Sequence, residues 1–227
     1  MIYLIFSAII YFIPSLWVNY TLNKHNDVLP NMPFSAKEFG EELLKEKGLD
    51  DVKIETTKDG DHYELIDKAV RVEPSRLDRK SLTSITIMCH EIGHAIQHKE
   101  KYPPLERRYK IAKVTNFLTK LASGIGYIGI PAVLATGALP LIRVCLIVVF
   151  ASILISMIIH LMTLDVELDA SFKRAMPILE KKIPQEYHSA CKSILRVCAF
   201  TYVIASLTSI LKVRNLWMFV RIFLFRR

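Results

Sequence analysis

The sequence has little cysteine, and its four cysteines form no recognisable pattern. Cys89, Cys145, Cys191 and Cys198 lie in apolar or helical stretches, at spacings that match neither a disulfide framework nor a cysteine-ligated zinc site. We expect them to be small packing residues. The sequence also contains no internal repeat and no low-complexity segment, so it gives no indication of a repeat architecture.

The N-terminal segment lacks the marks of a cleaved signal peptide. Residues 1–18 are apolar but have no basic region before them, and no small-x-small cleavage site follows, since the next residues are Asn19, Tyr20 and Thr21. An uncleaved anchor helix is therefore the better interpretation.

The chain lacks any nucleic-acid-binding motif, although its formal net charge is +8. Hydrophobic residues make up 52% of its 227 residues and charged residues 23%, and the two kinds alternate in long blocks. This pattern is typical of an integral membrane protein, and the basic excess fits cytoplasmic loops. We therefore expect a lipid bilayer, and no nucleic acid, among its partners.

The composition predicts five segments along the chain. A transmembrane anchor is followed by an α+β domain, a transmembrane helical hairpin, a polar helical segment and a last helix that is transmembrane or interfacial. Most lysines and arginines lie in the two polar segments, which places both on the cytoplasmic side. The respective ranges are 1–18, 19–113, 114–164, 165–196 and 197–227.

The first polar segment contains clear helix and strand signals. Ser35 followed by Glu38 is a capping box that predicts a helix ending before Gly48. Alternation in 51–57 and 69–72 predicts two or three short strands, and a longer helix is expected over 81–99.

Two further expectations concern the same polar parts of the chain. The strand at 69–72 precedes the longer helix, so we expect it to be an edge strand to which an extended substrate adds through main-chain hydrogen bonds. The second polar segment, 165–196, is expected to be helical, with breaks at Pro177 and Pro184.

The chemistry is carried by the run His90-Glu91-Ile92-Gly93-His94. Residues four apart lie on one face of a helix, so His90 and His94 can reach the same metal ion. Glu91 then lies beside the metal, where it can accept a proton from a bound water. This HExxH pattern predicts a zinc-dependent hydrolase with Glu91 as general base.

A catalytic zinc ion takes three protein ligands, so a third must come from elsewhere. On a straight helix His98 lies about 6 Å further along the axis than His94, and Glu100 is similarly distant. His160 lies inside an apolar stretch, where an ionisable group is unusual. Glu167 is the best candidate, and Asp165 or Asp169 is then expected to hold a ligand histidine in its tautomer.

The run 90–98, HEIGHAIQH, resembles the YugP-type family of neutral zinc metallopeptidases of bacterial membranes. The similarity extends to Asp61-His62-Tyr63, to residues 166–171 and to Thr201-Tyr202-Val203. One departure is that the family often continues Asp-His-Tyr with Asp-Pro, where this chain has Glu64 and Leu65.

The resemblance implies a glutamate-zincin fold in which His90, His94 and Glu167 bind zinc and Glu91 is the base. His62 and Tyr63 are candidates for stabilising the oxyanion of the tetrahedral intermediate, or else form a structural pair at a strand edge.

The sequence thus predicts a mostly α integral membrane protein with three to four transmembrane helices and a small zincin-like α+β domain. We expect a multi-pass protein of the cell membrane whose zinc site, on the cytoplasmic side, cleaves peptide or protein substrates, membrane proteins among them. The alternative is a metal-binding membrane protein without hydrolytic activity, a sensor or scaffold.

Overall fold

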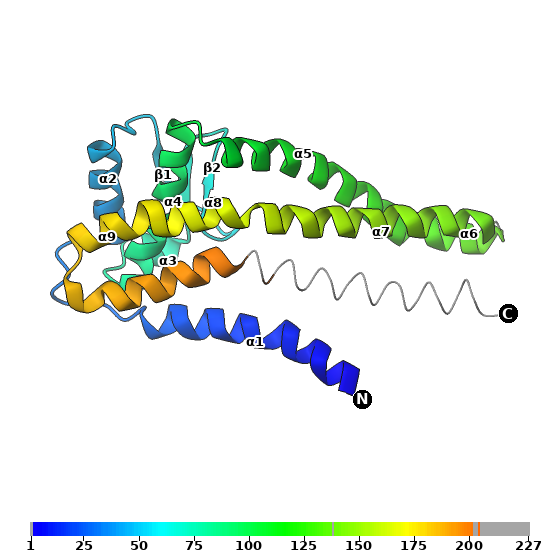
Figure 1. Cartoon of the computed structure of the whole chain (residues 1–227), viewed down its shortest axis with the longest axis horizontal. Helices are drawn as coiled ribbons and strands as arrows, with labels where there is room; N and C mark the ends of the chain where they lie inside the picture. The colour runs from blue at the N-terminus through cyan, green and yellow to red at the C-terminus, as the bar shows by residue number, and fades with distance from the viewer. Residues whose placement is uncertain (1, 138, 202–203, 205–227) are drawn as a thin grey trace. The chain divides into compact units, whose positions relative to one another are not determined.

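The computed structural model describes residues 2–137, 139–201 and 204. The chain divides into two compact units (Figure 1). The sheet unit comprises Ile13–Glu106 and Leu164–Thr201, and the hairpin unit comprises Met1–Phe12, Arg107–Thr163 and Tyr202–Arg227. The two polar segments of the sequence, which lie far apart along the chain, therefore fold together in the sheet unit.

Helix α2 (Ala36–Glu46) confirms the predicted capping box. The Glu38 carboxylate accepts a hydrogen bond from the Ser35 amide at 2.7 Å, and the Ser35 hydroxyl accepts one from the Glu38 amide at 3.3 Å. The helix is followed by Gly48, whose φ of +62° favours glycine and ends the helix as predicted. Phe39 and Leu43 on its inner face are almost completely buried, which fixes α2 against the core.

The three strands form one mixed sheet in the order β1-β3-β2. Strand β1 (Lys53–Thr56) pairs in parallel with β3 (Ala69–Val72), and β2 (His62–Glu64) pairs with β3 in antiparallel orientation. The prediction that residues 69–72 form an edge strand is therefore wrong, because β3 has a partner on each side. An extended substrate cannot add to it.

Asp61, at the start of β2, joins the sheet to the short helix α3 (Pro74–Leu77). Its carboxylate accepts hydrogen bonds from the Glu73 amide at 2.8 Å and from the Arg76 guanidinium. Burial raises the pKa of Asp61 above its ordinary value, and Arg76 partly opposes that effect. The first residue of the Asp-His-Tyr run thus has a structural role.

Helix α4 (Leu82–Lys99) forms the centre of the sheet unit and agrees with the predicted helix at 81–99. It begins at Ser81, whose hydroxyl accepts a hydrogen bond from the Ser84 amide. Helix α2, strands β2 and β3, and the segment after residue 164 all contact it, so nearly its whole circumference is buried. Such a helix holds polar side chains at fixed positions inside the unit.

The segment from Leu164 to Lys182 is one continuous helical stretch (Figure 1). It consists of α8 (Leu164–Leu168), the π-helical segment η2 (Asp169–Ala175) and α9 (Met176–Lys182). The predicted break at Pro177 is wrong, because the helical backbone continues through this residue from η2 into α9. Pro184 does lie in a break, before a 3₁₀ turn at Gln185–Tyr187 and a helix over 188–201.

In the hairpin unit, α5 (Pro103–Gly124, whose first residues belong to the sheet unit) leads into the π-helical segment η1 (Ile125–Gly129) and α6 (Ile130–Thr136). Helix α7 (Leu139–Met162) packs against α6 and η1. Among the described residues, no helix is both long and apolar enough to cross a membrane.

The predicted three to four transmembrane helices are thus contradicted for the described part of the chain. The first half of the predicted hairpin at 114–164 is divided among the end of α5, η1 and α6. The predicted multi-pass topology and the cytoplasmic placement both depended on these spans, so neither is supported. Most of the predicted C-terminal helix at 197–227 lies outside the described residues.

Candidate metal centre

Three buried side chains of the sheet unit come together as a candidate metal site. His90 and His94 lie one turn apart on α4, and Glu167 reaches them from α8. The carboxylate oxygen Oε2 of Glu167 lies 3.3 Å from Nε2 of each histidine. The two imidazole rings meet edge to face, with centroids 4.8 Å apart. The sequence-predicted ligand set is thus assembled from segments more than 70 residues apart.

The donor atoms have the spacing that zinc requires. Zinc binds imidazole nitrogen and carboxylate oxygen at about 2.0–2.1 Å, and a tetrahedral arrangement then places neighbouring donors about 3.3 Å apart. The two distances from Glu167 Oε2 agree with this value. Two nitrogens and one oxygen are also a donor set that suits zinc, and a fourth position remains for water or substrate.

The Nδ1 nitrogen of each ligand histidine, which faces away from the metal position, has a buried hydrogen-bond partner. Nδ1 of His90 lies 3.1 Å from the Ser171 hydroxyl, which itself donates to the Leu195 carbonyl at 3.3 Å. Nδ1 of His94 lies 2.9 Å from the side-chain oxygen of Gln97. Because the Ser171 hydroxyl and the Gln97 oxygen can both accept, each Nδ1 carries the proton and each Nε2 presents its lone pair to the metal position.

Gly93 permits the close approach of α4 to η2 on which the site depends. A Cβ atom at this position would lie 2.9 Å from the backbone carbonyl oxygen of Ala170, a contact that only backbone movement could relieve. Ala170 stands between Asp169 and Ser171, whose side chains both face α4 partners. The glycine between the two ligand histidines therefore lets the two backbones meet.

Asp169 lies close to the centre but does not reach a ligand histidine directly. Its carboxylate accepts hydrogen bonds from Gln97 at 2.9 Å and from Arg174 at 2.6 Å. Burial favours its neutral form, but these hydrogen bonds outweigh burial and hold the pKa of Asp169 below its ordinary value. The two histidines take Ser171 and Gln97 as partners, so neither Asp169 nor Asp165 orients them directly.

Glu91, the predicted base, follows His90 on α4 and is 7% exposed. Its side chain is therefore largely shielded from bulk water.

His62 and Tyr63 make other contacts. The Tyr63 hydroxyl lies 2.9 Å from Nδ1 of His98, and Nδ1 of His62 lies 2.8 Å from the Gly60 carbonyl. Burial, with Asp51 and Glu64 nearby, raises the pKa of Tyr63 to about 12. A role of either residue in stabilising an oxyanion stays a prediction.

The other described candidates for a third ligand, His98 and Glu100, have different partners. His98 is the partner of Tyr63, and Glu100 binds Arg174 at 2.7 Å. His160 belongs to α7, and its side chain lies outside those described. Only Glu167 joins His90 and His94 in a group of possible metal ligands among the described residues.

Sequence reasoning did not find Gln97 and Ser171 as partners of the ligand histidines. Gln97 follows His94 by three residues on the same helix, and Ser171 follows Glu167 by four. Both spacings put the later residue on the same helical face as the earlier one, which is the signal that could have identified them.

Two histidines of an HExxH helix completed by a glutamate from a later helix define a metallopeptidase-type centre. The family model described as "Putative neutral zinc metallopeptidase" matches residues 1–223. The "Putative membrane protease YugP" of Bacillus subtilis strain 168 is 31% identical over 217 residues, which cover 92% of either chain. No solved structure matches the chain significantly. The chain belongs to this zinc metallopeptidase family, which confirms the resemblance, and its cofactor is zinc.

Proposed function

We propose that this protein hydrolyses peptide bonds, with zinc held by His90, His94 and Glu167 and with Glu91 as general base. The observation that carries the proposal is the position of Glu167, whose Oε2 is 3.3 Å from Nε2 of both histidines of α4, the helix that also carries the buried Glu91. The family membership supports the same activity.

Each residue of the centre has a defined task in this reaction. Zinc bound by these residues would polarise the substrate carbonyl and lower the pKa of a bound water towards neutrality. Glu91 accepts a proton from the attacking water and transfers it to the leaving amine as the peptide bond breaks. Ser171 and Gln97 hold the two imidazoles in the tautomer that leaves Nε2 available.

The proposal predicts a zinc-dependent endopeptidase activity. Purified protein should cleave a fluorescence-quenched, unfolded protein substrate, because an extended chain presents its peptide bonds to a buried centre. A chelator of zinc should abolish cleavage, and added zinc should restore it. Cleavage that continues at the same rate after complete zinc removal would contradict the proposal.

We also propose that the protein associates with a lipid bilayer surface, as the word "membrane" in the relative's name suggests for that protein. Support comes from α1 (Ile2–Lys24), on which four large apolar or aromatic side chains share one helical face and are 40% exposed or more. Lys24 follows in the last turn, with its ammonium 6.0 Å from the Tyr20 ring centroid. Aromatic and basic side chains together favour a membrane interface. The four are Ile13, Leu16, Trp17 and Tyr20.

Flotation with lipid vesicles tests this association. Wild-type protein should float with phosphatidylcholine–phosphatidylglycerol vesicles, and replacement of Leu16 and Trp17 by Gln should lower the bound fraction several-fold. Ile66→Gln is the matched control, since Ile66 is an exposed apolar residue of the same unit that does not belong to α1. Equal flotation of all three proteins, or of none, would contradict the assignment. Protein substrates at the same surface would include membrane proteins.

A further inference from the structure

Gln97 is a completely buried side chain with a full set of partners. Its exposed fraction is 0%. Its oxygen Oε1 lies 2.9 Å from His94 Nδ1, and its nitrogen Nε2 lies 2.9 Å from both the Val166 carbonyl and the Asp169 carboxylate. A buried amide is costly unless its donors and acceptor are satisfied, so this arrangement defines one preferred orientation.

The partners of Gln97 determine which atom of its amide faces His94. The Val166 carbonyl and the Asp169 carboxylate accept hydrogen bonds and donate none, so the NH₂ group must face them. Oε1 is then the atom that faces His94, and Nδ1 of His94 must be the donor. The amide therefore admits a single His94 tautomer, in which Nε2 is unprotonated on the side of Glu167.

Asp169 is in turn held by Arg174. The guanidinium donates from Nε to Asp169 Oδ1 at 2.6 Å, although the two residues are five positions apart. In an α-helix that spacing would direct the side chains to different faces, whereas the i→i+5 geometry of the π-helical segment η2 brings them together. The unusual helix geometry thus supplies the support for Gln97.

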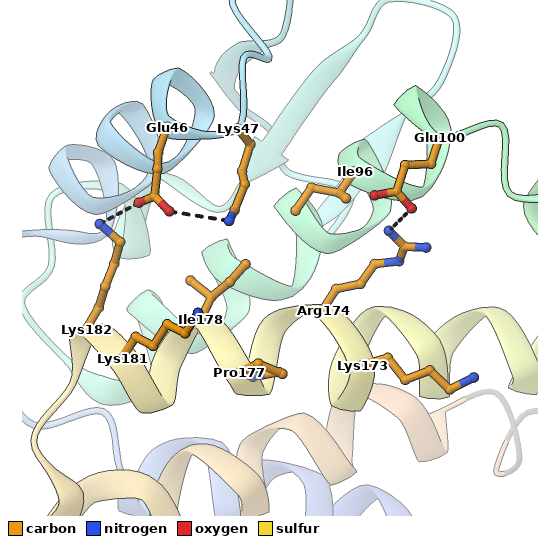
Figure 2. Close-up of a pocket in the computed structure, with 10 residues that line it drawn as sticks. All are labelled: Glu46, Lys47, Ile96, Glu100, Lys173, Arg174, Pro177, Ile178, Lys181 and Lys182. Carbon is orange, nitrogen blue, oxygen red and sulfur yellow. Dashed lines mark hydrogen bonds and ion pairs between the residues drawn. The ribbon is translucent and has the colours of Figure 1, made fainter.

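Arg174 connects this buried chain of hydrogen bonds to the surface. Figure 2 shows its guanidinium meeting Glu100 at the end of α4. The two side chains are 2.7 Å apart, and both line a pocket of about 300 Å³. The same guanidinium lies 5.6 Å from the centroid of the Tyr102 ring. Its side chain is 13% exposed, which limits its motion.

We infer that Gln97 is a positioning residue for zinc binding, and that Asp169 and Arg174 act through it. The inference rests on the metal centre of the proposed function. His90 has weaker support, because its partner Ser171 is a single rotatable hydroxyl that donates to one carbonyl, whereas the Gln97 amide is held by two acceptors. The His94 side of the centre is therefore the pre-organised one, and loss of Gln97 should weaken zinc binding while the protein stays folded.

The test is the zinc Kd of the purified full chain, measured by competition with a chelating dye. Gln97→Met keeps the length of the side chain and removes both its polar groups, and it should raise Kd by about 10- to 100-fold. Thr86→Val is the matched control, since it removes a buried polar group from the same helix and should leave Kd unchanged.

A pair of substitutions at Asp169 separates positioning from folding. Asp169→Asn keeps an oxygen that accepts from Gln97 and should retain most of the affinity, whereas Asp169→Ala should lose it. The double variant Gln97→Met/Asp169→Ala should bind zinc no more weakly than Gln97→Met alone, because Asp169 acts through Gln97. The comparison of Asp169→Asn with Asp169→Ala gives an answer even if Gln97→Met fails to fold.

Two results would overturn the inference. If Gln97→Met and Asp169→Ala lower the melting temperature but bind zinc as tightly as wild type, Gln97 is merely structural. Additive losses in the double variant would show that Asp169 acts independently. A wild-type chain that binds no zinc would instead overturn the proposed function itself, so the two failures are distinguishable.

Discussion

Replacing Glu91 by Gln is expected to lower kcat/KM for peptide hydrolysis by about 10²- to 10⁴-fold while zinc remains bound. The amide has nearly the same shape as the carboxylate, so the fold of α4 and the three zinc ligands should not change. It cannot accept a proton from water at neutral pH, and the step that depends on this transfer is lost. Rates on the quenched substrate, with zinc content measured on the same samples, give the result.

Glu41→Gln provides the control, because Glu41 is an exposed carboxylate on α2, outside the metal centre. Its activity should equal that of wild type. If Glu91→Gln retained the wild-type rate with zinc bound, Glu91 would not be the base. If neither wild type nor variant hydrolysed any peptide while both bound zinc, a non-hydrolytic sensor or scaffold would become the better explanation.

The second large effect is expected on stability. Zinc binds the assembled ligands of the folded chain, so it should raise the free energy of unfolding by about 4 kcal/mol when free zinc is 1,000 times its Kd. Glu167 is 1% exposed and supplies the third donor from a distant segment. In Glu167→Ala the gain should largely disappear. Thermal or urea unfolding with and without zinc measures this gain in stability for wild type and for Glu167→Ala.

Asp165→Ala is the matched control for this experiment, because Asp165 is an acidic residue in the same helix that does not belong to the ligand group. It should respond to zinc as wild type does. An equal stabilisation of Glu167→Ala would show that zinc binds elsewhere or without the glutamate.

The local elements of the sheet unit could be predicted because their signals are local. Ser35 and Glu38 define the start of α2, and the HExxH spacing defines one face of α4. Glu167 could be proposed because a third zinc ligand was needed and the family resemblance suggested this position. The sequence alone does not predict that Glu167 lies 3.3 Å from both histidines, because this contact depends on tertiary packing.

The structural features that the sequence did not predict depend on backbone geometry, for which the composition gives no signal. The π-helical segment η2, which places Arg174 beside Asp169, has no signature in its sequence. Strand β3 is central because β2, only three residues long, pairs along its other side. The transmembrane prediction relied on apolar runs, and these do not show that the first half of the predicted hairpin at 114–164 is divided among several elements.

The zinc content of purified wild-type protein and of Glu167→Ala, determined by mass spectrometry, tests the three-ligand centre most directly. We expect about one zinc ion per wild-type chain and a loss of most of that zinc in the variant. Retention of a full equivalent by Glu167→Ala would contradict the three-ligand centre. A wild-type chain without zinc would contradict the assignment of zinc peptidase activity as a whole.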